Sequence, residues 1–72
     1  MAALKFVCKT NSKDNHNEVK KKLYFAGGAI IREKIWDISS GFQSELEIIC
    51  EGGTLYRDLK DSGLVTNITI VN

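Results

Sequence analysis

The spacing of apolar residues differs from one segment of the chain to the next, and the order of these spacings constrains the fold more strongly than any single motif. Segments with a two-residue period, which is typical of strands, alternate with segments whose apolar residues recur at helical spacing. Residues 45–51 show the clearest two-residue period, which places Leu46, Ile48 and Cys50 on one face. Residues 4–9 alternate in nearly the same way. We therefore expect two half-buried strands whose apolar sides face one core.

The first helix is predicted from a capping pattern and a helical stripe. Asn15 followed by Glu18 matches a capping box, so residues 10–17 are expected to form a polar loop that leads into the helix. Apolar residues then follow at i, i+4 and i+7, namely Val19, Leu23 and Ala26. Gly27 and Gly28 supply the left-handed stop that commonly ends a helix.

Three further segments complete the pattern. Residues 29–39 and 64–71 are rich in residues that favour strands, and a turn is expected around residues 40–41. Between them, Thr54 can cap a short helix that Gly63 ends. The chain is thus expected to contain four strands and two helices.

The resulting order is β-α-β-β-α-β, which is the ferredoxin-like arrangement of α+β domains. It predicts a four-stranded antiparallel sheet in the order 4-1-3-2, with both helices on one face. Residues 1–72 are expected to form one small domain, because this length leaves room for one core. The alternative is a β-grasp-like fold, which would pair the first two strands as a hairpin although a helix lies between them.

Composition excludes several classes of protein. With 43% hydrophobic and 26% charged residues, the chain has the composition of an ordinary globular domain. No apolar run approaches the roughly 20 residues that cross a membrane, and the start lacks a signal-peptide pattern. We expect a cytoplasmic protein with reduced cysteines and without a membrane partner.

The few residues with reactive side chains do not form a recognisable catalytic or metal site. Cys8 and Cys50 are expected to face the core near opposite ends of neighbouring antiparallel strands, more than ~7 Å apart and unable to form a disulfide. His16 is interpreted as a solvated loop residue near a helix start, with no third residue to orient it. One histidine and two separated cysteines do not make a zinc site. We expect no enzyme activity, no cofactor and no metal.

Charge is distributed unevenly along the chain. Residues 1–36 carry eight Lys or Arg against three Asp or Glu, whereas residues 37–72 carry two against six. The basic residues include a run in the first helix and one lysine before it, namely Lys13, Lys20, Lys21 and Lys22. Binding of a nucleic acid or another anion through this helix and the preceding loop is the alternative function.

The sheet face opposite the helices is the predicted partner surface. A sheet with helices on one side leaves its other side wet or paired. Its expected residues include Val7, Trp36, Ile49 and Val71, interspersed with lysines and glutamates. The sequence therefore favours a small non-enzymatic binding or regulatory module that acts through protein–protein association. We expect a homo-oligomer formed through the open sheet face or an edge strand.

Overall fold

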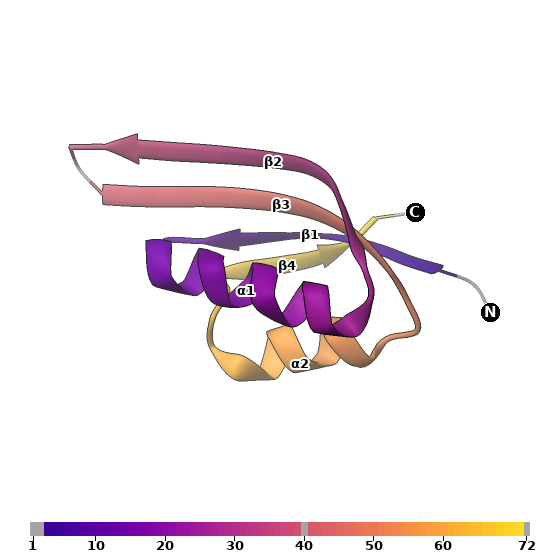
Figure 1. Ribbon diagram of the computed structural model, residues 1–72. Helices are drawn as coiled ribbons and strands as arrows, with labels where there is room; N and C mark the ends of the chain where they lie inside the picture. Colours follow the sequence, from indigo (N-terminus) through magenta and orange to yellow (C-terminus); the bar gives the residue numbers. More distant parts are fainter. Residues whose placement is uncertain (1–2, 40, 72) are drawn as a thin grey trace.

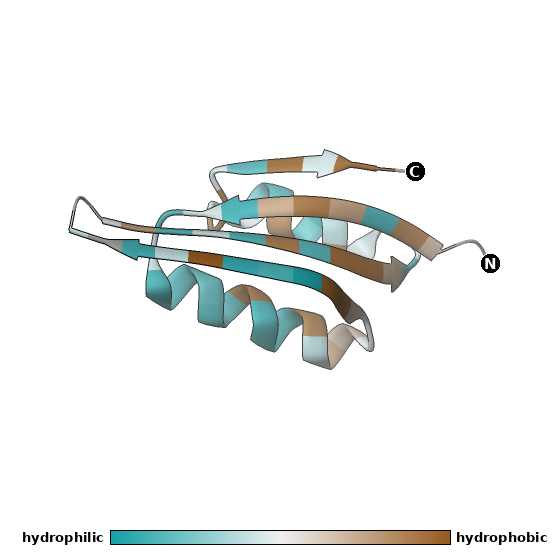
Figure 2. Ribbon diagram, turned by 90° about the horizontal axis from the view of Figure 1, so that it is seen from above, coloured by the Kyte–Doolittle hydropathy of each residue, from teal (hydrophilic) through white to brown (hydrophobic). Residues whose placement is uncertain are grey.

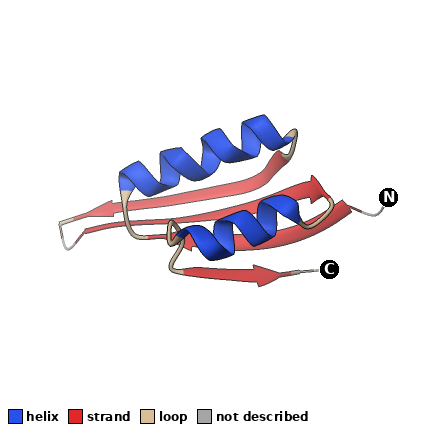
Figure 3. Ribbon diagram, turned by 90° about the horizontal axis from the view of Figure 1, so that it is seen from below, coloured by secondary structure: helices blue, strands red, loops and turns tan. Residues whose placement is uncertain are grey.

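A computed structural model describes residues 3–39 and 41–71. Its elements are β1 (Ala3–Thr10), α1 (Lys13–Ala26), β2 (Ala29–Ile38), β3 (Gly41–Glu51), α2 (Thr54–Ser62) and β4 (Asn67–Ile70) (Figure 1). The sheet has the order β2-β3-β1-β4 with all neighbours antiparallel, and both helices lie on the same face (Figure 3). The predicted ferredoxin-like fold is confirmed. The β-grasp alternative is wrong, because β3 lies between β1 and β2.

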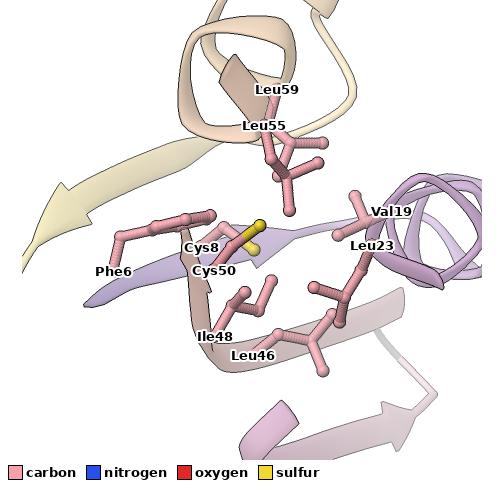
Figure 4. Close-up of a cluster of buried hydrophobic side chains, with 9 residues drawn as sticks. All are labelled: Phe6, Cys8, Val19, Leu23, Leu46, Ile48, Cys50, Leu55 and Leu59. Atoms are coloured by element: carbon pink, nitrogen blue, oxygen red, sulfur yellow. The ribbon is translucent and has the colours of Figure 1, made fainter. Parts of the chain in front are cut away.

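The core fills the space between the sheet and the two helices. Alternate residues of β1 and β3 point toward the helices, as the two-residue period predicts, and α1 and α2 each contribute two side chains. The buried cluster contains Phe6, Cys8, Val19, Leu23, Leu46, Ile48, Cys50, Leu55 and Leu59 (Figure 4). Fully burying a large apolar side chain stabilises a fold by about 1.5–3 kcal/mol, so these few residues dominate the stability of a small domain.

The two cysteines lie in this core without a disulfide between them. Cys8 pairs with Leu46 and Cys50 pairs with Leu4 in the ladder between β1 and β3. Four residues of strand separate the two positions, which corresponds to about 13 Å at the usual rise per residue. The predicted separation and inward orientation of both cysteines are confirmed.

The connection between β1 and α1 is much shorter than predicted. The polar loop over residues 10–17 is wrong, because β1 continues to Thr10 and α1 begins at Lys13. Ser12 caps the helix: its hydroxyl accepts the Asn15 backbone N–H at 3.3 Å. Ser12 thus takes the capping role that the sequence analysis assigned to Asn15.

The β2–β3 hairpin extends past the end of β1. The first three residues of β3 pair with β2 alone, since β1 ends at Thr10 opposite Ser44. Residue 41 opens β3 rather than lying in a turn, and residue 40 is outside the described residues. The resulting two-stranded arm makes the molecule elongated, with extents of 43 × 20 × 18 Å (Figure 1).

Candidate functional site

Strand β2 forms one edge of the sheet and bonds only to β3 within the described residues. It has ten residues, whereas β4 at the other edge has four. A register shift between Ile30 and Arg32 interrupts its ladder with β3. Ile31 and Ile35 are 48% and 52% exposed, which is unusual for isoleucines on a long edge strand. The strand therefore offers both unpaired backbone groups and apolar side chains.

The end of α1 extends this apolar edge. Tyr24 and Phe25 in the last turn are about four-fifths exposed, and their rings pack edge to face at 5.9 Å. Gly27 ends the helix with a φ of 75°, and the chain turns directly into β2 (Figure 1). Hydropathy colouring shows the start of β2 as hydrophobic and the stretch after it as hydrophilic (Figure 2). We define the β2 flank as the exposed residues Tyr24, Phe25, Ile30, Ile31 and Ile35.

Gly28 allows α1 and β2 to approach each other closely at this junction. A Cβ at this position would lie 2.4 Å from Leu23 Cδ1 and 3.0 Å from the Ile49 carbonyl oxygen. Only glycine fits there without displacing the neighbouring atoms. The close approach of α1 and β2 at this junction therefore depends on a glycine at position 28.

A chain of polar side chains, of which Thr10, His16 and Ser44 are buried, ties the beginning of α1 to the sheet. His16 is 3% exposed; its Nδ1 lies 2.8 Å from Ser44 Oγ, and its Nε2 lies 2.7 Å from Glu33 Oε2. The Ser44 hydroxyl is also 2.5 Å from the Thr10 hydroxyl, and Lys20 Nζ lies 3.2 Å from Glu33 Oε2. The prediction of a solvated loop histidine is wrong. The helix begins early enough to place His16 in its second turn, facing the sheet.

Ser44, His16 and Glu33 are connected in the order of a nucleophile, a base and an orienting carboxylate. However, Ser44 is 1% exposed, and its hydroxyl already contacts Thr10. The Ser44 side chain is therefore engaged inside the fold rather than presented to solvent. The arrangement instead satisfies the hydrogen bonds of buried polar groups, whose loss would be costly.

The Glu33 carboxyl is held in its charged form by this network. Burial raises its pKa, but hydrogen bonds and positive charge from Lys20 and His16 outweigh that effect, so the pKa lies below its ordinary value. Glu33 therefore anchors the middle of β2 to α1 through two charge-assisted contacts. No pattern in the sequence predicted this role of Glu33.

The predicted residues of the open sheet face fall into two places. Ile49 pairs with Lys5, Val7 lies two residues further along β1, and the Val71 N–H donates to the Lys5 carbonyl at 2.8 Å. These three apolar residues therefore surround Lys5, and each is half-buried. Trp36 pairs with Gln43, six residues along β3 from Ile49, which corresponds to about 20 Å. The four residues do not form one continuous patch.

The predicted basic residues of α1 are also dispersed. Lys20, Lys21 and Lys22 follow one another at about 100° steps around the helix, so they point in different directions. Lys20 contacts Glu33, and Lys21 lies 3.6 Å from Glu18. Lys13 is the first residue of the helix. The run therefore does not present three charges on one surface.

The remaining reactive groups are a buried cysteine thiol and scattered metal-ligating residue types. Burial raises the pKa of the Cys8 thiol to about 11, which keeps it protonated and unreactive at neutral pH. Among residues 3–39 and 41–71, no group of three or more His, Cys, Asp or Glu is placed to hold a metal ion. The helices of the described part of the chain are all too short or too polar to span a bilayer.

A groove of about 480 Å³ lies where β1 ends and the hairpin arm continues. Its lining includes Lys9, Asn11, Trp36, Gln43 and Thr66. Trp36 and Gln43 are paired residues on the open side of the sheet, and Lys9 follows the same side on β1. Thr10 and Ser44 complete the lining, and Ser44 pairs with Ile35, so the groove adjoins the β2 flank at this point of the strand.

Comparisons with known proteins relate this chain to others by fold alone. No family model and no curated protein matches the sequence. Several solved structures are similar, and three of them are described here. An unknown protein from Galdieria sulphuraria superposes with a TM-score of 0.64 at 11% identity over 97% of this chain and 44% of that one. The quorum-quenching acylase GqqA gives a TM-score of 0.59 at 15% identity over 94% and 39% of the two chains.

The third structure is an ACT domain from the GTP pyrophosphokinase of Chlorobium tepidum. It superposes with a TM-score of 0.63 at 13% identity over 96% of each chain. The present chain thus spans a whole ACT domain but less than half the length of the other two proteins. These likenesses show a ferredoxin-like α+β fold.

Proposed function

We propose that this domain is a non-enzymatic association module that pairs with a second copy of itself through the β2 flank. The observation that carries this proposal is the length and character of β2. It is a ten-residue edge strand with isoleucines exposed along it and two exposed aromatic residues at the adjoining helix end. Natural sheets usually protect such an edge, and pairing with another strand satisfies its free N–H and C=O groups.

The edge is a better candidate than the open sheet face. The apolar residues of that face are half-buried and are separated by Lys5 and Glu47. Those of the β2 flank are between 37% and 81% exposed. Covering the flank would remove more apolar surface from water, which is the main source of association free energy.

The likeness to other structures is compatible with an association role. One neighbour is a domain of a GTP pyrophosphokinase, and the two others extend well beyond the matched region. We also propose a cytoplasmic location, because both cysteines are buried as free thiols and contribute to the core without a disulfide.

Three lysine substitutions test the proposal. Ile35→Lys changes the β2 edge, Ile70→Lys changes a similarly exposed isoleucine at the β4 edge, and Ile49→Lys changes the open face. Solution mass is measured by light scattering after size exclusion, at low and high salt. We expect a dimer of the unmodified protein that persists in high salt, dissociation by Ile35→Lys, and an intact dimer with the other two.

The outcomes separate the competing surfaces. If only Ile49→Lys dissociated the dimer, the surface of self-association would be the open sheet face and not the β2 edge. An unmodified protein that stays monomeric at all concentrations would refute self-association. Binding to nucleic acid through Lys13, Lys20, Lys21 and Lys22, the alternative, would weaken steeply as salt rises, whereas apolar edge pairing would not.

A further inference from the structure

The groove at the end of β1 combines side chains that suit a planar, anionic ligand. It exists because β1 stops at Thr10 while β2 and β3 continue as the hairpin arm. The carbonyl of Lys9 accepts the Thr66 N–H at 2.8 Å and the Thr66 hydroxyl at 3.2 Å. This double contact closes one side of the groove with the segment that precedes β4.

An aromatic ring and two amides also line the groove. Trp36 is 43% exposed, so much of its indole is available to a ligand. Gln43 is its cross-strand partner, and directly opposed residues of antiparallel strands have side chains about 5 Å apart at Cβ. Asn11, at the end of β1, is also exposed. Each amide can both donate and accept hydrogen bonds.

Positive charge exceeds negative charge beside this ring. Glu45 pairs with Lys9 on one side and with Lys34 on the other, so two ammonium groups face one carboxylate. None of the three ion pairs within the described residues involves Lys9. An anionic group in the groove would therefore find an ammonium group that is free to bind it.

We propose that this groove binds a nucleotide. The base stacks on Trp36, the amides of Gln43 and Asn11 bond to its edge, and the Lys9 ammonium binds the phosphate. Stacking on an aromatic side chain with hydrogen bonds to the base edge is how proteins recognise unpaired bases. The volume of about 480 Å³ lies within the usual range of small-ligand sites. A bare anion would leave the indole and the amides unused.

The same chemistry could come from a free nucleoside monophosphate or from the end of a single-stranded nucleic acid. Isothermal titration with AMP, GMP, CMP and UMP tests the first source, and a short single-stranded RNA tests the second. Trp36 is the sole tryptophan of the chain, so its fluorescence reports occupancy of the groove independently. Adenosine and inorganic phosphate, titrated separately, divide the contribution of the base from that of the anion.

We expect saturable binding of at least one monophosphate with quenching of Trp36. Lys9→Gln should weaken that binding about tenfold while leaving the weaker binding of adenosine unchanged. Lys5→Gln is the matched control, because Lys5 lies four residues earlier on the same face of β1 and does not line the groove. Trp36→Leu should weaken binding about tenfold or more by calorimetry.

Equal effects of Lys9→Gln and Lys5→Gln would overturn the proposal, as would the absence of saturable binding for every nucleotide and the RNA. Tighter binding of the RNA than of any monophosphate would assign the groove to a strand end. Titration of an Ile31→Lys variant, which changes the β2 flank at a position that does not line the groove, keeps this test independent of self-association. Nucleotide binding by a monomeric variant would support the proposed ligand of the groove. The role of the β2 flank in self-association is tested separately by solution mass.

Discussion

The two edges of the sheet differ in how far the rest of the chain covers their apolar side chains. At the β4 edge, Leu64, Val65 and Ile68 pack against the same apolar core that α2 covers. At the β2 edge, α1 is held by the polar contacts of His16 and Lys20 with Glu33, while Ile31 and Ile35 remain exposed. The β4 edge is thus packed against the core and exposes Ile70 alone of its isoleucines, whereas the β2 edge exposes several apolar side chains. An edge strand indicates a surface for pairing when the fold leaves its apolar side chains exposed.

The largest expected effect concerns the core beneath the β4 edge. Leu59→Ala removes a fully buried side chain of α2 and should lower the free energy of unfolding by about 2–5 kcal/mol. Ile35→Ala, at the β2 edge, should change the free energy of unfolding of the monomer by no more than about 0.5 kcal/mol. Urea denaturation at low protein concentration measures both variants. Similar losses from both would mean that Ile35 is part of the core.

The junction of α1 and β2 should be nearly as sensitive. Gly28→Ala places a Cβ against Leu23 and Ile49, so we expect a loss of about 1–3 kcal/mol from overpacking. Gly53→Ala is its control, since that glycine has a φ of −104° and open space around it. Thermal unfolding should leave the Gly53 variant close to the unmodified protein. A stable Gly28→Ala variant would contradict the close approach at this junction.

Removal of the histidine should have an effect of similar size. His16→Ala leaves Ser44 buried without one of its partners and removes one contact of Glu33, so we expect a loss of about 1–3 kcal/mol. Denaturant unfolding of this variant is compared with Asn17→Ala, an exposed position one residue further along α1. If both variants unfold at the same denaturant concentration, the polar network does not hold the β2 edge.

The smallest expected effect is the acid dependence of Glu33. Its pKa is lower in the folded state, so its contribution to stability is complete above the ordinary carboxyl pKa of about 4.3 and is lost as pH falls through the folded-state value. Glu33→Gln should therefore flatten the acid limb of stability against pH. Glu18→Gln, which removes an exposed i, i+3 ion pair, should leave that limb unchanged. If the unmodified protein and both variants lost stability in parallel as pH falls, the lowered pKa of Glu33 in the folded state would be contradicted.

The sequence predicted the order of elements and the core because both depend on local periods. The strand faces of Phe6, Cys8, Leu46 and Ile48 could be read from alternation alone. The strand order then followed from the ferredoxin-like connection pattern. Each of these inferences requires only near neighbours in the chain and general rules of topology.

The polar network could not be predicted because long-range pairing decides it. Two residues, Ser12 and Asn15, could cap α1, and the choice depends on β1 continuing to Thr10 opposite Ser44. One signal was available: His16 precedes Val19 by three residues and Leu23 by seven, so it continues their helical stripe. The partnership of Glu33 with His16 and Lys20 joins two elements and had no sequence signal of its own.

Self-association through the β2 flank is tested most directly by amide hydrogen exchange of β2 and β4, measured by NMR at low and high protein concentration. Pairing through the β2 edge should slow exchange of β2 amides as concentration rises and leave β4 amides unchanged. Ile35→Lys should remove this concentration dependence, whereas Ile70→Lys should retain it. Exchange of β2 that is independent of concentration, in a protein shown to be a dimer by mass, would contradict the account.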